Sequence, residues 1–372
     1  MKKKEILIFI SDEGFGHAVR QRALIKSLLK KNKRLSIKVI TSKKIILLKE
    51  TFKNRISYFH YHNLIETIKN DDGSINKVKT KKMFLSWYKK KKIWVKAMKE
   101  KFPKPNFIVS DSVPQAFDLA KELNVKSINI SHFTWDWFYK KHFLEKKKKD
   151  FIFKELTNSY NLAKKFLILP LTPSEIIKNF KEKCININLI ISDFKIIKKK
   201  RYKNFVCVIM DNGTNTLSKL IKESVPYLNK IKNVDFYVGI KDYDNVIKKY
   251  ISLSKNIYPI YGLKKIHHTI PYADFVIARA GFNTITETLV LNKPSIFFNE
   301  TKNEETSHNI KMLQKFGIAS IIKKNEFKKK IVKKINYFIK NEYKILRQKI
   351  INAKFLSNGS ENASNLILKE LK

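Results

Sequence analysis

A loop at residues 11–20 carries residue types that could bind an anion and move a proton. Gly14 and Gly16 follow an apolar run that ends at Ile10, and His17 stands where a helix should begin. Glycines let the backbone approach a bulky anion closely, and the first turn of a helix offers unpaired N–H groups and the positive end of its dipole. We predict that this loop holds a phosphate or an acceptor group. A lone histidine is more often structural, but the flexible glycines favour His17 as a general base or an orienting donor.

A carboxylate follows a second apolar run in the same half of the chain. Asp111 comes after the run 107–109 and before Pro114, a residue suited to the first turn of a helix. Parallel strands deliver their carboxyl ends to one side of a sheet, so we expect Asp111 to face the same crevice as His17. The structural alternative for Asp111 is a helix N-cap.

Residues 129–139 combine five aromatic side chains with polar ones. Sugar rings and lipid moieties pack on aromatic faces, so this segment could form a wall or lid around an acceptor, with Asp136 as a further candidate base. An interdomain packing cluster is the alternative. The candidate acceptor contacts are His132, Phe133, Trp135 and Trp137.

The most specific motif spans residues 272–287. A buried strand should end at Ala278, Gly281 should make a turn, and Asn283 or Thr284 should cap a helix that carries Glu287 in its first turn. Thr284 and Glu287 have the spacing of a capping box, which is a purely structural account. The helix start is nevertheless a second anion site, and a carboxylate beside it can accept hydrogen bonds from both hydroxyls of a ribose.

Short apolar runs that alternate with helical stretches predict parallel sheets covered on both faces, in two doubly wound units. The lysine-rich stretch 195–203 is the expected linker. The expected domains are therefore 1–194 and 204–341, followed by a last helix over 342–372. The expected strands are 5–10, 36–40, 57–61, 107–109, 126–130, 166–169, 205–210, 234–238, 257–260, 275–278 and 295–298, and the expected helices include 18–29, 113–123, 214–222 and 284–291.

The composition restricts the function class. The 372 residues include 78 Lys+Arg and 32 Asp+Glu, a net charge of +46, but only seven of the basic residues are arginine, the side chain that nucleic-acid readers favour. We therefore expect no nucleic-acid partner. Two cysteines are too few for a disulfide scaffold or a cysteine zinc site, and lysines interrupt every apolar run before the ~18 residues of a membrane span. We expect a cytoplasmic protein that contacts the inner face of the membrane.

Several of these segments together resemble the GT-B glycosyltransferases. Residues 273–281, Thr284, 286–287, Pro294 and 308–309 are similar to the nucleotide-sugar signature of the group that contains the peptidoglycan-lipid N-acetylglucosaminyltransferase. Residues 14–17, 109–111 and 133–136 resemble the glycosyltransferase-like domain of plant arabinose kinases. The resemblance implies two Rossmann-like domains facing across a cleft, and a last helix that packs back on the first domain.

The resemblance also implies residue roles. Glu287 would hold the ribose. The diphosphate would be held by Gly281, Asn283 and Thr284. From the other domain, Gly16 and His17 would close on the pyrophosphate and the acceptor. Lys264 and Arg279 would neutralise the diphosphate, and the backbone of Tyr261, Gly262 and Leu263 would face the base. Two positions depart from the family pattern: the glycine-rich loop of the second domain has only Gly213 beside Thr214, and an Asp-Gln pair is absent, with Glu304, Glu305 and His308 near its place. Asn309 is a further candidate donor contact.

The expected activity is transfer of a hexose or N-acetylhexosamine from a nucleotide diphosphate sugar, UDP-linked, to an acceptor hydroxyl. Inversion without metal or other cofactor is expected, with His17 as the first candidate for the base and Asp111 or Asp136 as the second. The expected partners are this donor and a carbohydrate or lipid-linked acceptor. A nucleotide-sugar hydrolase and a non-catalytic subunit are the alternatives.

Overall fold

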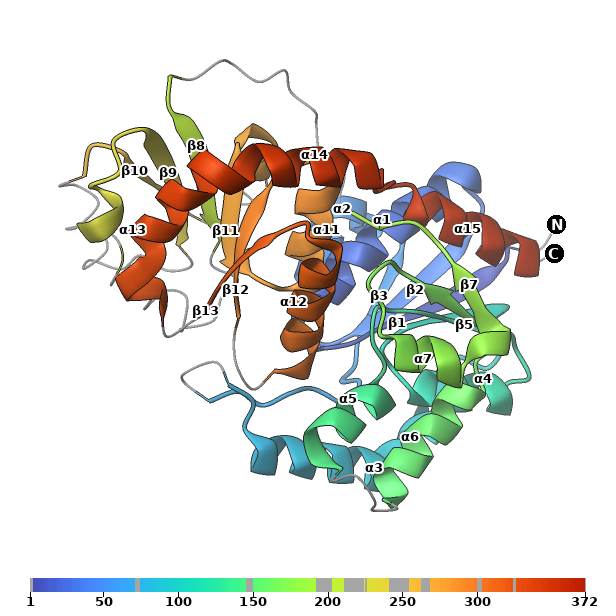
Figure 1. Cartoon of the computed structure of the whole chain (residues 1–372). Helices are drawn as coiled ribbons and strands as arrows, with labels where there is room; N and C mark the ends of the chain where they lie inside the picture. The colour runs from blue at the N-terminus through green and yellow to red at the C-terminus, as the bar shows by residue number, and fades with distance from the viewer. Residues whose placement is uncertain are drawn as a thin grey trace. The chain divides into compact units, whose positions relative to one another are not determined.

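The computed structural model divides into two compact units (Figure 1). Unit 1 contains Met1–Ile68, Ile75–Ser192 and Leu356–Lys372, and unit 2 contains Lys69–Ser74 and Asp193–Phe355. The structure describes residues 3–70, 74–144, 150–191, 203–210, 224, 226–240, 254–261, 268–299, 303–323 and 326–371. The expected helix at 214–222 and all of the expected linker except Lys203 lie outside these ranges.

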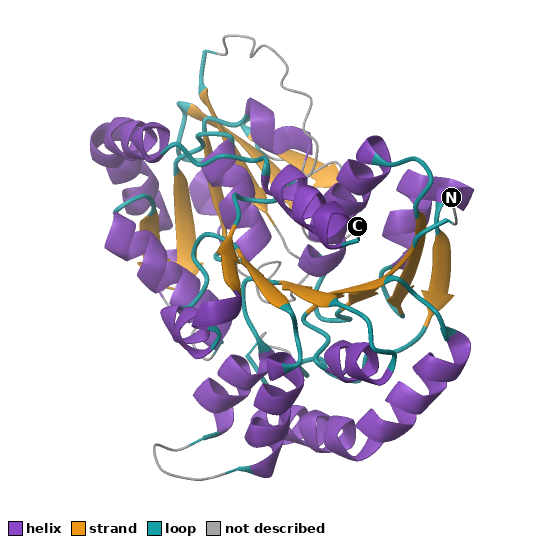
Figure 2. Ribbon diagram, turned by 90° about the vertical axis from the view of Figure 1, so that its right-hand side faces the viewer, coloured by secondary structure: helices purple, strands orange, loops and turns teal. Residues whose placement is uncertain are grey.

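Unit 1 is built on a seven-stranded parallel sheet with the order β3-β2-β1-β4-β5-β6-β7. Its central strands are almost wholly buried, because helices cover both faces of the sheet (Figure 2). The strands are β1 (Glu5–Ile10), β2 (Ser36–Thr41), β3 (Ser57–His60), β4 (Phe107–Asp111), β5 (Ser127–Ile130), β6 (Lys165–Ile168) and β7 (Cys184–Asn186). The helices are α1 (Gly16–Lys31), α2 (Ile45–Phe52), α3 (Lys77–Lys101), α4 (Gln115–Glu122), α5 (Trp135–Phe143), α6 (Phe151–Asn161), α7 (Ser174–Asn179) and α15 (Gly359–Glu370).

Unit 2 repeats this plan with six parallel strands in the order β10-β9-β8-β11-β12-β13. Each sheet reverses its strand order once, between β1 and β4 in unit 1 and between β8 and β11 in unit 2. Open α/β sheets bind ligands at such switch points, beyond the carboxyl ends of the strands. The strands are β8 (Phe205–Met210), β9 (Val234–Ile240), β10 (Ile257–Tyr261), β11 (Phe275–Arg279), β12 (Ser295–Asn299) and β13 (Ser320–Lys323), and the helices α11 (Phe282–Val290), α12 (Glu304–Phe316), α13 (Phe327–Tyr337) and α14 (Tyr343–Ala353).

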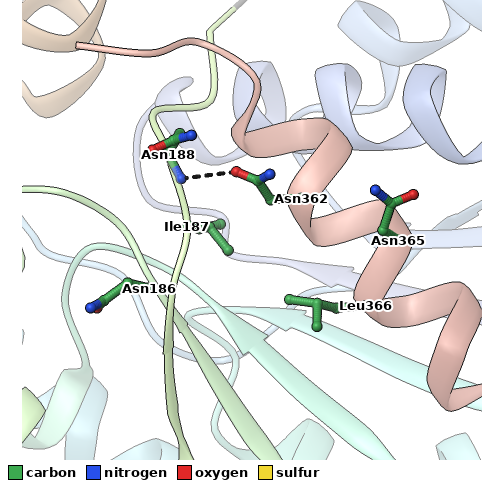
Figure 3. A pocket seen from close by; sticks show the side chains of 6 residues that line it. All are labelled: Asn186, Ile187, Asn188, Asn362, Asn365 and Leu366. Atoms are coloured by element: carbon green, nitrogen blue, oxygen red, sulfur yellow. Dashed lines mark hydrogen bonds between the residues drawn. The ribbon is translucent and has the colours of Figure 1, made fainter. Parts of the chain in front are cut away.

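The end of the chain differs from the expected single helix over 342–372. It forms α14 and α15, separated by a turn in which Lys354 adopts a left-handed conformation with φ 48°. Helix α15 packs against α1 in unit 1, where the Ser27 and Ser364 hydroxyls lie 2.8 Å apart. A cavity of about 420 Å³ lies where α15 meets Asn188, whose N–H donates to Oδ1 of Asn362 over 3.2 Å (Figure 3).

All eleven expected strands are present, and two short edge strands were missed. Strands β7 and β13 have three and four residues and lie at one edge of their sheets. Within the described ranges, no helix is long and apolar enough to cross a membrane.

Candidate active site

The switch point of unit 1 brings His17 and Asp111 together. Nδ1 of His17 lies 2.7 Å from Oδ1 of Asp111, and the two side chains are 5% and 0% exposed. A carboxylate oxygen can only accept a hydrogen bond, so Nδ1 of His17 is the donor, and in the neutral imidazole the lone pair lies on Nε2. This tautomer suits Nε2 to the role of a proton acceptor.

The pairing of β1 with β4 brings His17 close to Asp111. Strands β1 and β4 are parallel neighbours whose register pairs Ile10 with Asp111, and the Ser11 N–H donates to the Asp111 carbonyl over 3.0 Å. The chain then turns through Gly14, whose φ of 42° is in the region that glycine adopts easily, and α1 begins at Gly16. His17 therefore lies in the first turn of α1, directly beyond the strand end.

Two further side chains of α1 hold the same carboxylate. Arg20 donates to Asp111 from Nε to Oδ2 over 3.0 Å and from Nη2 to Oδ1 over 2.6 Å, and Gln21 donates to Oδ2 over 2.8 Å. Arg20 and Gln21 were not among the predicted site residues. Their spacing of three and four residues from His17 was the available signal, because such residues share one face of a helix.

The electrostatics of Asp111 follow from these contacts. Burial alone would raise the pKa of its carboxyl group, but the charge interactions with Arg20 and His17 and the hydrogen bonds from both side chains hold that pKa well below its usual range. Asp111 is therefore ionised. It does not act as the helix N-cap considered above, since helix α4 starts after Pro114 without a side-chain cap.

A second buried carboxylate orders the loops around this site. Oδ1 of Asp12 accepts from the Thr41 hydroxyl over 3.0 Å and from the Ser42 N–H over 2.9 Å, and its Oδ2 accepts from the Asn63 N–H over 2.8 Å. Asn63 in turn donates from Nδ2 to the carbonyl of Ile10 over 2.7 Å. The residues that follow β1, β2 and β3 are thus tied together, which gives the loop before His17 a defined path.

The aromatic segment lies partly beside this pair and partly in the core. The rings of His132 and Phe133 have their centroids 6.4 and 5.9 Å from that of His17. Trp135 and Trp137 are 0% and 4% exposed and belong to a hydrophobic cluster of unit 1. The expected aromatic wall is therefore mainly core packing, and His132 and Phe133 are its members next to His17.

Asp136 differs from Asp111 in its surroundings. It lies on the first turn of α5, is 1% exposed, and accepts a hydrogen bond from the Thr157 hydroxyl over 3.4 Å. Burial raises the pKa of its carboxyl group. The contact with Thr157 joins α5 to α6.

The switch point of unit 2 carries the motif at residues 272–287. Strand β11 ends at Arg279, and α11 starts at Phe282 with Gly281 as its N-cap and without a side-chain cap. The helix thus begins before Asn283 and Thr284, which corrects the capping that the sequence suggested. Thr284 and Glu287 are buried, at 4% and 2% exposure, on the first two turns of α11.

Helix α12 begins beside the same strand ends. Its N-cap Asn303 accepts from the Thr306 N–H over 3.3 Å, and Asn309 donates from Nδ2 to the carbonyl of Ala280 over 3.0 Å. Asn309 therefore ties α12 to the turn between β11 and α11. Glu304 and His308 lie on the same helix, within its first two turns.

Some expected donor contacts cannot be placed. Tyr261 is the last residue of β10. Outside the described residues lie Gly213, Thr214, Gly262, Leu263 and Lys264.

Comparison with known proteins bears on both units. Residues 212–365 match the glycosyltransferase family 28 C-terminal domain. A UDP-N-acetylglucosamine–N-acetylmuramyl-(pentapeptide) pyrophosphoryl-undecaprenol N-acetylglucosamine transferase of Clostridium tetani is 28% identical over 161 residues, which cover 42% of this chain and 44% of the relative. The enzyme of the same name from Wigglesworthia glossinidia brevipalpis is 27% identical over 164 residues, 43% of this chain and 44% of the relative. The chain thus matches less than half the length of these relatives.

Solved structures match the whole chain. The glycotransferase of kitacinnamycin has a TM-score of 0.75 at 13% identity and covers 100% of both chains. MurG of Acinetobacter baumannii has a TM-score of 0.64 at 14% identity, covering 98% of this chain and 99% of its own. This chain has the GT-B fold.

Sequence similarity is uneven within this GT-B protein. The family 28 match lies largely in unit 2, where Arg279, Gly281 and Glu287 surround the switch point. The likeness of unit 1 to other GT-B structures is one of fold, so the His17–Asp111 pair must be judged on its own geometry.

Proposed function

We propose that this protein is a glycosyltransferase that moves a hexose or N-acetylhexosamine from a UDP-linked donor to an acceptor hydroxyl, with inversion and without a metal ion. The observation that carries the proposal is the buried 2.7 Å contact between His17 Nδ1 and Asp111 Oδ1. It leaves Nε2 of His17 as a base at the carboxyl edge of a Rossmann-like sheet, in a chain whose other unit matches a glycosyltransferase domain.

The chemistry would proceed as one displacement. Nε2 of His17 takes the proton of the acceptor hydroxyl, the acceptor oxygen bonds to the anomeric carbon of the donor, and the bond from that carbon to the diphosphate breaks. Asp111 stabilises the imidazolium that results. Attack from the face opposite the leaving group inverts the anomeric centre. Asp136 is excluded as the base in this proposal, because its hydrogen bonds serve α5 and α6.

Unit 2 would hold the donor. The start of α11 offers N–H groups to the diphosphate at Gly281, Asn283 and Thr284, and Arg279 and Lys264 add positive charge. These groups replace a metal ion in stabilising the departing charge. Glu287 accepts hydrogen bonds from the ribose hydroxyls, and the chain at Tyr261 faces the base. Glu304, His308 and Asn309 at the start of α12 contact the sugar or its phosphates.

The acceptor would be lipid-linked. The curated relatives are named for a pyrophosphoryl-undecaprenol acceptor. Helix α3 has eleven lysines against one acidic residue, Glu100. On its exposed face Val78 and Ile93 are 69% and 71% exposed among these lysines. A basic face with exposed apolar side chains suits an anionic bilayer surface, so we infer peripheral contact with the inner face of the membrane.

Two assays test this function. UDP-, GDP- and dTDP-sugars are screened for a rise in melting temperature, because a ligand that binds only the folded state stabilises it. The sugar that stabilises the protein is then incubated with and without polyprenyl-phosphate-linked acceptors. We expect release of UDP that depends on the acceptor, with a glycosylated product. Equal release of free sugar without acceptor would instead identify a hydrolase, and no stabilisation by any nucleotide sugar would contradict both activities.

A further inference from the structure

Arg20 contacts both members of the His17–Asp111 pair. Its side chain is 2% exposed, and its guanidinium contacts both oxygens of Asp111 at 2.6 and 3.0 Å. Planar two-point contact of this kind fixes the orientation of a carboxylate as well as its position. Lysine, with a single point charge, could not reproduce it.

The same guanidinium also approaches the imidazole. Nη2 of Arg20 lies 3.1 Å from Nδ1 of His17. Since Nδ1 carries the proton that is donated to Asp111, these two nitrogens are both donors and no hydrogen bond joins them. The contact is therefore one between a fixed positive charge and a ring that becomes positive only when it takes a second proton.

A charge count shows what this arrangement favours. Asp111 and Arg20 form a neutral buried pair, so neutral His17 adds no charge to the site, whereas protonated His17 leaves the group at +1 with little solvent to screen it. Without Arg20, a buried carboxylate alone would face His17 and would favour the imidazolium in the resting protein. A base that is already protonated cannot accept the proton of a hydroxyl.

We propose that Arg20 is a positioning residue for the base. It holds the Asp111 carboxylate so that Oδ1 faces Nδ1 of His17, and its charge, 3.1 Å from that ring nitrogen, disfavours the imidazolium. Gln21 supports the same carboxylate from the next position of α1, with Nε2 2.8 Å from Oδ2. This inference rests on the proposed function only where it predicts turnover; the state of the His17 ring can be measured without it.

Other titratable groups pack around the pair from neighbouring elements. His132 follows β5 with its ring 6.4 Å from that of His17. Tyr160 of α6 interacts electrostatically with Asp111, and burial raises its pKa so that it stays neutral. Asp12 follows β1 and is engaged with Thr41, Ser42 and Asn63. Among the charged groups with described contacts to Asp111, Arg20 is the one that offsets the carboxylate permanently.

The test compares three variants with the wild-type protein. Arg20→Gln removes the charge and the fork, Arg20→Lys keeps the charge but loses the fork, and Arg22→Gln removes the same charge from the same helix two residues away, on a different face. The readouts are melting temperature, the pH profile of kcat/KM, and the ¹⁵N NMR signals of the His17 ring, assigned by comparison with His17→Gln.

We expect the acidic limb of kcat/KM to move to higher pH by about one unit in Arg20→Gln, because removing a positive charge favours the imidazolium. The His17 ring should titrate at correspondingly higher pH by NMR. In Arg20→Lys the limb should stay in place while kcat falls roughly tenfold, short of the loss expected for removal of the base itself. Arg22→Gln should match the wild type in all three readouts.

Three outcomes would overturn the proposal. The first is an Arg20→Gln protein that folds and keeps both the wild-type limb and the wild-type NMR titration. The second is an Arg20→Lys protein that folds with wild-type kcat, which decides the matter even where Arg20→Gln fails to fold. The third is a lower melting temperature with no change in the ring signals, which would make Arg20 structural. If the protein has no transferase activity, the NMR titration alone still tests Arg20, so the two failures are distinguishable.

Discussion

The two units fix their polar residues at corresponding points of the same topology by different means. In unit 1, buried side chains bond to one another, and four hydrogen-bond contacts from His17, Arg20 and Gln21 converge on the Asp111 carboxylate. In unit 2, the turn after β11 is held through the backbone, since Gly281 is the N-cap of α11 and Asn309 bonds to the carbonyl of Ala280. The first arrangement suits proton transfer, which depends on side-chain chemistry. The second suits binding of a diphosphate by N–H groups.

The difference between a site built from side chains and one built from backbone predicts how each unit responds to substitution. A site made from side chains loses its function when one of them is shortened. A site made from backbone N–H groups depends on the path of the chain, and its side chains add affinity to a geometry that persists without them. Turnover should therefore be most sensitive in unit 1 and donor affinity in unit 2.

The largest effect should come from His17→Ala. We expect kcat to fall by about a thousandfold, because a positioned general base contributes on the order of 10²- to 10⁴-fold. Binding of UDP, measured by calorimetry, should stay within about twofold of wild type, since nucleotide contacts are assigned to unit 2. Unchanged turnover in His17→Ala would contradict the assignment of proton transfer to unit 1. An equal loss of UDP affinity would contradict the assignment of nucleotide binding to unit 2.

Glu287→Gln, in unit 2, should weaken donor binding more than it lowers turnover. If Glu287 accepts from two ribose hydroxyls as we propose, replacing its carboxylate should weaken UDP binding by roughly tenfold or more, since hydrogen bonds to charged groups contribute about 1.5–3 kcal/mol. The kcat at saturating donor should fall less than the affinity. The matched control is Glu326→Gln, which removes an exposed carboxylate of unit 2 paired with Lys330. Wild-type UDP affinity in Glu287→Gln would show that the ribose is held elsewhere.

A stability effect confined to unit 1 is expected for Gly359→Ala. A Cβ atom at this position would lie 2.0 Å from the carbonyl oxygen of Asn188, so the start of α15 must shift away from the chain at residues 188–189. Such crowding destabilises by about 1–3 kcal/mol. Hydrogen exchange should show lost protection in α15 and β7 but not in β11 or β12. Ser360→Ala, its neighbour on α15, should melt like the wild type, and unchanged protection in Gly359→Ala would contradict the docking described here.

The smallest effect is a pH dependence located in unit 1. Burial lowers the pKa of His142 from 6.5 to about 4. On acidification the unfolded chain binds this proton near pH 6.5 while the folded chain binds it only near pH 4, so stability falls as the pH drops through this window. His142→Phe should lose that part of the decline, a difference of a few degrees in melting temperature between pH 7 and pH 5. His60 is exposed, so His60→Phe should keep the wild-type dependence of melting temperature on pH. The same pH dependence in the wild type, His142→Phe and His60→Phe would contradict the assignment to His142.

Much of the fold could be predicted because strands buried on both faces are continuous apolar runs, as in residues 6–10 and 275–278. The break between α14 and α15 was missed because it depends on a left-handed Lys354 and on the close approach of Gly359 to Asn188, neither of which alters the helical periodicity. The aromatic segment was misjudged for a related reason. A segment that contains Trp135 and Trp137 can form a hydrophobic core as well as a binding surface. Only the packing in the tertiary structure distinguishes the two.

The amino-acid sequence alone determined which residues follow each strand, and hence that His17 and Asp111 would lie at one edge of a parallel sheet. It also placed Arg20 and Gln21 on the helical face that His17 occupies. Only the tertiary structure decided that these side chains meet on one carboxylate. The reason is the strand order, which pairs β1 with β4 and so brings Asp111, 94 residues after His17 in the chain, within hydrogen-bond distance of α1.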